Sequence, residues 1–308
     1  MDVSRVSLHR IYPHVNSLST AFANGSLPSL KAARESYREV RAAVGLKPST
    51  NGSWLTAPSD QAKFKKTAMP TYGLSLLPNN VAARTARQLG VDPVAFGLPD
   101  EFDACGNASP HCKTLCLNYA GHGSATSVVT GRLARTLLLF CRPLDAMSIW
   151  LHELSKASKR HVEFAHRPNV FSDIPWEMVY PDMLHAVDNM YSYDYTKHWN
   201  RRSVDQYHLT FSADERRSLS EIRRRVQSGY GNVAVVVDCG VNDPKPAWWN
   251  GMRTVDGDDP VWGDARYLDP DNRVVLLSAK GRARQSRHRH SPFIWPLTVS
   301  YPVEGDDA

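Results

Sequence analysis

The length, composition and charge of the chain exclude several classes of protein. With 308 residues, of which 42% are hydrophobic and 22% charged, the chain can bury a full core in one main domain, which excludes bulk disorder. Its five cysteines are too few and too unevenly spaced for a disulfide framework, and no apolar run is long enough for a membrane-spanning helix. The N-terminal residues lack the apolar core of a secretory signal, so a cytoplasmic protein is expected.

The first half of the chain predicts mostly helices. Apolar residues recur at helical spacing over 30–44, and we expect residues 1–67 to form a helical extension. The core domain, expected over 68–285, begins with a short strand in MPTYGLSLLP and a short helix over 81–89. Two longer helices are predicted over 127–140 and 144–158, with a break at Pro143.

Beyond residue 160 the chain changes to short apolar runs that end in polar residues. These runs are HVEFAHRPNVFSD, MYSYDYTK, QYHLTFS and GNVAVVVDCG, and each is a strand candidate. Helical patterns over 174–187 and 213–227 separate them, a further strand is expected over 273–277, and residues 286–308 form a basic, irregular tail. Strands that alternate with helices predict an α/β fold with a parallel sheet.

The polar residues that close these runs are candidates for a functional site, because ligands of parallel α/β folds bind at the carboxyl ends of the strands. Asp173 is either a helix N-cap or an active-site acid, while Asp194 and Lys197 suit acid–base work or substrate anchoring. We therefore expect Asp173, Asp194 and Lys197 to be catalytic. The expected substrate-binding residues are Asn169, Ser172, Tyr195 and Thr196.

Cys105, Cys112 and Cys116 form a C-x6-C-x3-C cluster in a loop that runs into a helix. Three thiolates can bind zinc, with His111 or His122 as fourth ligand, or three irons of a 4Fe-4S cluster whose fourth iron stays open. The absence of a C-x2-C pair favours the iron–sulfur cluster. The alternative is that these cysteines are small buried hydrophobic residues.

Two basic segments and one acidic segment are further candidates for ligand binding. Arg132 and Arg135, one helical turn apart, could bind phosphate or carboxylate on a substrate, or form an exposed basic face. The segment KGRARQSRHRH is expected to contact nucleic-acid phosphates. Its expected binding residues are Lys280, Arg282, Arg284 and Arg287. The acidic residues of 256–271 could bind a divalent cation, although a solvated acidic loop is the more common explanation.

The order of these motifs resembles a known group of proteins. The cysteine loop is followed by RLARTLLLF, RPNVFSDIPWE, YDYTK, YHLTFS, VDGDD with ARYLDP, and SAKGRAR, over about residues 68–285. This order resembles proteins of bacteriophages and some bacterial mobile elements that are related in pattern to the phage gene-product-88 family. The resemblance implies a divergent radical-SAM-type partial (β/α) barrel with mostly parallel strands, in which Cys105, Cys112 and Cys116 match the cysteines of the group.

These observations predict a phage-type metalloprotein, namely a radical-SAM-like iron–sulfur enzyme that acts on nucleic acid or a nucleotide in the bacterial cytoplasm. The expected cofactor is a 4Fe-4S cluster, with zinc as the alternative and S-adenosylmethionine as a further candidate ligand. Two other interpretations stay open. One is a non-catalytic DNA-binding replication factor with a structural zinc site, and the other is a base-modifying transglycosylase with Asp173 or Asp194 as nucleophile. No membrane partner is expected.

Overall fold

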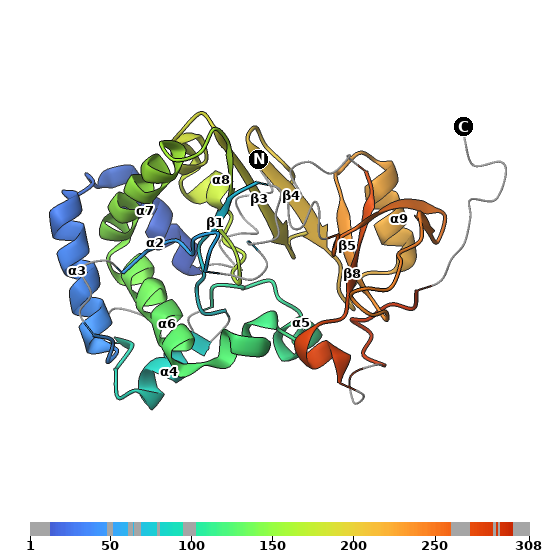
Figure 1. Cartoon of the computed structure of the whole chain (residues 1–308), viewed down its shortest axis with the longest axis horizontal. Helices are drawn as coiled ribbons and strands as arrows, with labels where there is room; N and C mark the ends of the chain where they lie inside the picture. Colours follow the sequence, from blue (N-terminus) through green and yellow to red (C-terminus); the bar gives the residue numbers. More distant parts are fainter. Residues whose placement is uncertain are drawn as a thin grey trace.

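The computed structural model describes residues 13–47, 52–60, 64, 69–78, 81–94, 103–259, 272–285, 288 and 290–297. Within these residues an open sheet of eight strands runs through the molecule (Figure 1). In spatial order the strands are β1 (Thr71–Gly73), β2 (Phe164–Arg167), β3 (Met190–Thr196), β4 (Tyr207–Ser212), β5 (Val233–Val237), β8 (Val274–Ser278), β7 (Met252–Asp256) and β6 (Trp248–Trp249).

The direction of the strands confirms the predicted fold class. Every pairing from β1 through β5, β8 and β7 is parallel, and β6 alone of the described strands pairs antiparallel, with β7. The sheet begins at β1 and ends at β6 without closing. The fold is therefore an α/β fold with a mostly parallel, open sheet.

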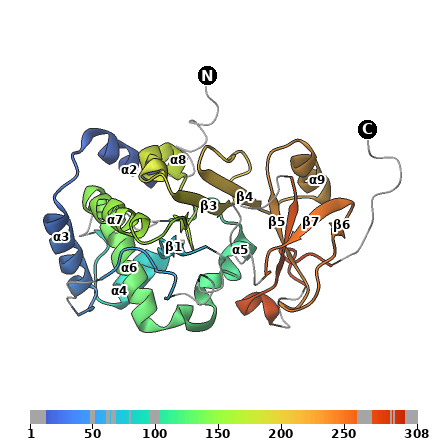
Figure 2. The same cartoon turned by 45° about the horizontal axis from the view of Figure 1, so that its top comes forward.

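Most of the described helices lie beside the first strands of the sheet, and α9 lies near its other end (Figures 1 and 2). The helices beside its first strands are α2 (Pro13–Asn24), α3 (Leu30–Ala43), α4 (Val81–Gln88), α6 (Thr126–Cys141), α7 (Pro143–Ser158) and α8 (Trp176–Val179), whereas α9 (Leu219–Gln227) lies beside β5. The shorter helical segments are α5 (Pro110–Thr114), η3 (Leu117–Tyr119), η4 (Gly121–Ser124), η5 (Pro181–His185) and η7 (Gly281–Arg284). No helix among the described residues is long and apolar enough to cross a membrane.

The predicted helices over 30–44, 81–89, 127–140 and 144–158 are confirmed as α3, α4, α6 and α7. The single helix predicted over 174–187 is wrong. Two short segments, α8 and η5, occupy this stretch, because Pro181 cannot donate a helical hydrogen bond and restricts the residue before it. The helix predicted from residue 213 begins only at Leu219, where Ser218 and Glu221 form a capping box.

Two hydrophobic clusters hold the sheet between these helices. The first joins α2, α3, α6 and α7 to strands β1 to β4, so the N-terminal helices share this core. Trp54, Trp150 and Trp176 lie at its centre and are fully buried. The second cluster packs α9 against β5, β7 and β8. Near the C-terminus Trp295 pairs with Val237 of β5, so this segment also packs on the sheet.

Candidate functional site

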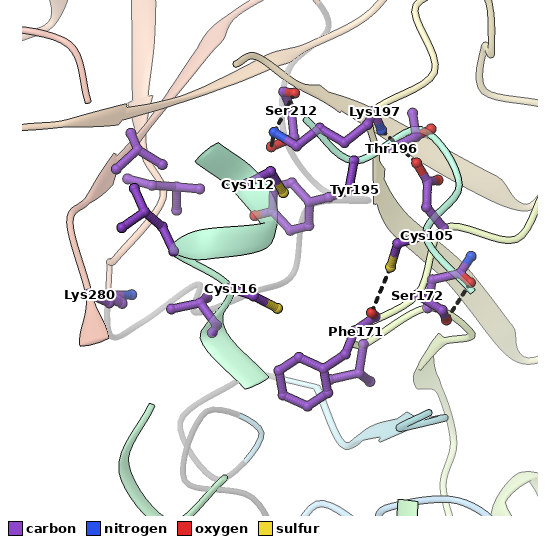
Figure 3. Close-up of a pocket in the computed structure, with 18 of the residues that line it drawn as sticks. Cys105, Cys112, Cys116, Phe171, Ser172, Tyr195, Thr196, Lys197, Ser212 and Lys280 are labelled. Carbon is purple, nitrogen blue, oxygen red and sulfur yellow. Dashed lines mark hydrogen bonds between the residues drawn. The ribbon is translucent and has the colours of Figure 1, made fainter. Parts of the chain in front are cut away.

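A cavity of about 270 Å³ lies at the carboxyl ends of the parallel strands (Figure 3). Its wall combines residues that end or follow β2, β3, β4 and β8 with the cysteine segment. The predicted site residues in this wall are Cys105, Cys112, Cys116, Asn169, Ser172, Asp173, Tyr195, Thr196, Lys197 and Lys280. The structure therefore brings most of the strand-end candidates and all three clustered cysteines together.

The cysteine segment belongs to the long connection between β1 and β2. Cys105 lies in a turn, Cys112 on α5, and Cys116 just before η3. Figure 3 shows the three thiols pointing into the same cavity from different positions on its wall. The Cys105 thiol donates a hydrogen bond to the carbonyl oxygen of Phe171 at 3.0 Å, which links the segment to the residues after β2.

Residues that follow β4 hold the cysteine segment in place. Ser109, the N-cap of α5, donates from Oγ to Oε2 of Glu215 at 2.7 Å, and the backbone N–H of His111 donates to Oε1 of the same carboxylate at 3.1 Å. Arg216 donates from Nη2 to the carbonyl oxygen of Asn107 at 2.7 Å. The first turn of α5, and with it Cys112, is therefore fixed to the end of β4.

Burial determines the protonation state of the three thiols. It raises the pKa of Cys105 well above the ordinary thiol value, raises the pKa of Cys112, and raises the pKa of Cys116 to about 11. Without a metal ion these thiols are neutral at pH 7 and weak nucleophiles. A bound cation would reverse this preference, because its charge stabilises thiolates.

The candidate metal ligands do not form one close group in the part of the chain that the structure describes. There, no three His, Cys, Asp or Glu side chains lie close enough together to hold a metal ion. The Nδ1 atom of His111 lies 3.1 Å from Oε1 of Glu215, and His111 is not in the cavity wall. The side chain of His122 is outside the described set. The protein offers three thiols around a shared space.

Asp173 and Lys197 are held by buried contacts in the cavity wall. Asp173 accepts from the backbone N–H of Lys197 and from Nη1 of Arg201, both at 2.7 Å. The Lys197 ammonium donates to Oγ and to the carbonyl oxygen of Ser212 at 2.9 and 2.8 Å. The idea that Asp173 caps the following helix is wrong, because Pro175 holds the N-cap position of α8.

Asp194 lies behind the wall rather than in it. This fully buried carboxylate accepts hydrogen bonds from the backbone N–H and Nδ2 of Asn169 at 3.0 and 2.8 Å, and from the hydroxyl of Tyr207 at 2.7 Å. Burial raises its pKa to about 7. Asn169 in turn accepts from Oγ of Ser172 at 2.8 Å. Asp194 therefore supports the loop that carries Ser172.

Tyr195 and Thr196, at the end of β3, each contact an arginine. The ring of Tyr195 lies 5.1 Å from the guanidinium of Arg167, which also lines the cavity. Oγ1 of Thr196 accepts from the backbone N–H of His198 at 3.0 Å and from Nη1 of Arg201 at 3.2 Å. Tyr195 is half-buried, whereas Thr196 is buried.

Arg132 and Arg135 are not in the cavity wall, and they bind different parts of the chain. Arg132 is buried, donates from Nη1 to Oδ1 of Asn118 at 2.6 Å, and lies 4.3 Å above the ring of Phe171. It thereby connects the turn after Cys116 to the cavity. Arg135 donates to the carbonyl oxygen of Ser53 at 3.2 Å.

The predicted nucleic-acid-binding residues of the basic segment do not share one contact or one surface. Lys280 lines the cavity and forms an ion pair with Asp258. Arg282 donates to the carbonyl oxygen of Thr114 at 3.5 Å, and Arg284 is exposed. Arg287 lies outside the described residues.

Two acidic residues of the described part of this segment, Asp256 and Asp258, bind lysines. Asp258 is buried, accepts from the backbone N–H of Ser278 at 2.7 Å, and lies 3.4 Å from Nζ of Lys245. Asp256 lies 3.2 Å from the same ammonium. These two carboxylates are thus neutralised by protein cations. Residues 260–271, with the other acidic candidates, lie outside the described set.

Sequence reasoning missed Glu215, Arg216 and Phe293. Phe293 lines the cavity, with its ring 4.8 Å from Nζ of Lys197. A signal for Glu215 and Arg216 was present, because they follow the strand-end motif YHLTFS as ADER. Phe293 has no comparable signal, since its position depends on how the C-terminal segment folds back along β5.

The fold and the site define an α/β protein with an open parallel sheet and a cysteine-lined cavity at the carboxyl ends of its strands. The family model of Gene product 88 matches residues 56–295, and the chain belongs to this family. No curated protein and no solved structure matches the chain.

Proposed function

We propose that this protein is an iron–sulfur enzyme of radical-SAM type, in which Cys105, Cys112 and Cys116 bind three irons of a 4Fe-4S cluster. The observation that carries this proposal is that one connection, between β1 and β2, supplies three thiols to a single cavity at the carboxyl ends of the strands. Ligands of open α/β sheets bind at this edge. The cysteine loop therefore lies at the edge of the sheet where ligands of this fold class bind.

The arrangement of the thiols favours a cluster over a single zinc ion. Tetrahedral zinc holds its cysteine sulfurs roughly 4 Å apart and requires a fourth ligand in a structural site. His111, one of the two candidates for that ligand, contacts Glu215 instead and does not line the cavity. A 4Fe-4S cluster needs only three cysteines, because one iron can stay without a protein ligand.

The residues around the thiols suit the binding of a small anionic molecule. When bound, the cluster would supply an open iron, to which a ligand such as S-adenosylmethionine could bind, and a one-electron reductant. The chain itself contributes Arg167, Lys197 and Lys280 to the wall, and each also lies beside a carboxylate, namely Asp194, Asp214 and Asp258 in that order. Their N–H groups can donate further hydrogen bonds to an anion in the cavity. Asp173 holds the backbone of Lys197 in place. Phe171 supplies an apolar surface beside Cys105.

Nucleic acid or a nucleotide is the proposed substrate class, and the enzyme would modify it in the cytoplasm of a bacterial host. The cationic residues of the cavity wall support this class, because phosphate groups bind to lysine and arginine. The phage-type family supports it as well. Asp173 and Lys197 are the proposed substrate-facing polar groups, with Asp194 as a support behind them.

The test is metal analysis of protein purified without oxygen, together with its absorption spectrum. We expect about four irons and four sulfides per chain in the wild type and a large loss of both in Cys112→Ala. Cys141→Ala is the matched control, because this half-buried thiol at the end of α6 does not line the cavity. It should keep the full iron content.

Two results would overturn the proposal. One tightly bound zinc per chain, retained in the anaerobic preparation in place of iron, would identify a structural or hydrolytic zinc site. Protein that folds, as shown by circular dichroism, but binds neither iron nor zinc would remove the metal centre altogether.

A further inference from the structure

Arginine and aromatic side chains gather around α9 and the connection between β3 and β4, away from the cysteines. Figures 1 and 2 show α9 beside β5, at the end of the sheet opposite α3 and α7. We call this region the arginine–aromatic surface. Its members are the stacked residues Trp199, Arg202, Arg217, Arg225 and Tyr230, together with the exposed Arg223 and Arg224 on the other faces of α9.

The rings and guanidinium groups of this surface stack on one another. The guanidinium of Arg202 lies 3.7 Å from the ring centre of Tyr230, and both residues are exposed. The guanidinium of Arg217 lies 4.5 Å from the ring of half-buried Trp199. Buried Arg225 lies 5.1 Å from the same ring and holds the two stacks together. Cation–π contacts of this kind keep guanidinium groups at fixed positions on a surface.

The same surface has an excess of positive charge. Arg217 pairs with Glu221 at 3.0 Å, whereas Arg223 and Arg225 donate to the carbonyl oxygens of Asn250 and Arg201 at 2.9 and 3.0 Å. Burial lowers the pKa of Arg225 to about 10, and the neighbouring positive charges contribute to this shift. A polyanion that bound here would relieve the repulsion between the arginines.

We propose that the arginine–aromatic surface binds single-stranded nucleic acid. Its exposed arginines bind the phosphates, and the exposed stack of the Arg202 guanidinium on the Tyr230 ring packs against bases. Single strands are favoured over duplexes because only unstacked bases expose faces to aromatic rings. This inference rests on the nucleic-acid part of the proposed function, but it does not require the metal centre.

The surface is placed to guide a strand to the cavity. The helix α9 follows β4 after a short turn that contains Glu215 and Arg216, the residues that hold the cysteine segment. Its 9 residues span about 14 Å along the helix axis. A single strand of nucleic acid that runs along α9 toward its first residue would therefore reach the end of β4, where Ser212 lines the cavity.

The test is fluorescence anisotropy with a labelled single-stranded oligodeoxythymidylate, titrated with the full chain at several salt concentrations. We expect the double variant Arg223→Ala/Arg224→Ala to bind the oligonucleotide at least about tenfold more weakly than the wild type. The slope of its log binding constant against log salt concentration should be smaller in magnitude by about two. Tyr230→Ala should weaken single-strand binding about fivefold or more while leaving duplex binding nearly unchanged.

Two control variants distinguish this surface from general basic charge. Arg160→Ala removes an exposed arginine after α7 and should bind as the wild type does. Arg284→Ala removes an exposed arginine of the predicted basic segment, and its effect should be smaller than that of the α9 double variant. Circular dichroism and thermal unfolding check that each variant is folded.

The proposal is overturned if the α9 variants bind the oligonucleotide as tightly as the wild type, or if Arg284→Ala weakens binding as much as they do. It is also overturned if the wild type does not bind the oligonucleotide. The same holds if the wild type binds anionic lipid vesicles and the variants lose binding to these vesicles but not to the oligonucleotide. Iron content is measured separately on the same proteins. Failure of this inference can thus be told apart from failure of the proposed metal centre.

Discussion

Ser109 donates a hydrogen bond from Oγ to Oε2 of Glu215 at 2.7 Å, and the two residues are 106 positions apart in the sequence. Ser109 is fully buried, so this contact replaces water on its hydroxyl, whereas Glu215 is half-buried. The same carboxylate accepts from the backbone N–H of His111. One side chain after β4 therefore fixes the first turn of α5, which carries Cys112.

Removing this carboxylate should loosen the cysteine segment. We expect Glu215→Ala to lower the free energy of unfolding by about 1.5–3 kcal/mol, because it leaves a buried hydroxyl and a backbone N–H without their charged acceptor. Iron content after anaerobic purification should fall as well, and Glu215→Gln should restore part of it. Glu35→Ala, at an exposed pair with Arg38, is the control and should change neither quantity. Equal iron content in all of these variants would show that Glu215 does not position the thiols.

Arg201 should be among the most costly residues to remove. It binds Glu177 through two hydrogen bonds of 2.8 Å and Asp173 through one of 2.7 Å, and it is buried. Arg201→Ala leaves these carboxylates without their partner, so urea unfolding should show a loss of about 3–5 kcal/mol. Arg142→Ala breaks an exposed pair with Glu39 and should cost less than about 1 kcal/mol. Similar losses in the two variants would contradict this account of burial.

Asp194 should make the protein less stable as the pH rises. Burial raises its folded-state pKa to about 7, above the ordinary carboxyl value, so the folded state holds a proton that the unfolded state has released between about pH 4 and 7. The stabilisation of the folded state by this bound proton is fully present below about pH 4 and is lost as the pH rises through 7.

The pH effect can be measured by urea unfolding at pH 5 and pH 8. The free energy contributed by Asp194 should fall by roughly 3 kcal/mol between these two values. Asp194→Asn cannot titrate, so its stability should change less over the same range, although the variant should be weaker overall because an amide cannot accept all the bonds from Asn169 and Tyr207. An identical pH dependence in the two proteins would rule out a raised pKa.

Two glycines offer a matched pair of alanine substitutions. A Cβ atom at Gly257 would lie 2.5 Å from Cδ2 of Leu277 and 2.9 Å from the carbonyl oxygen of Leu276, so Gly257→Ala should cost about 1–3 kcal/mol. Gly131 lies within α6 and would meet no atom within 4 Å. Gly131→Ala should therefore stabilise the protein by about 0.5–1 kcal/mol. Thermal unfolding of both variants measures the difference, and a stabilising Gly257→Ala would contradict the packing described here.

Local patterns in the sequence predicted the elements whose causes are local. Apolar spacing identified α3, α6 and α7, and Pro143 marks the boundary between the last two. The alternation of strands and helices predicted the parallel sheet, since a helix between two strands returns the chain in the same direction. The rule that polar residues gather at strand ends also identified much of the cavity wall, including Asp173 and Lys197.

Tertiary structure decided the partners of the charged side chains. Arg132 is a buried support for the turn after Cys116, Lys280 is paired with Asp258, and Asp194 lies behind the wall instead of in it. None of these outcomes follows from spacing, because the partner of each charge comes from a distant part of the chain and burial depends on the whole fold. The sequence by itself therefore determined the sheet, the main helices and the grouping of the cysteines, whereas long-range packing determined which polar residues face the cavity and which only support it.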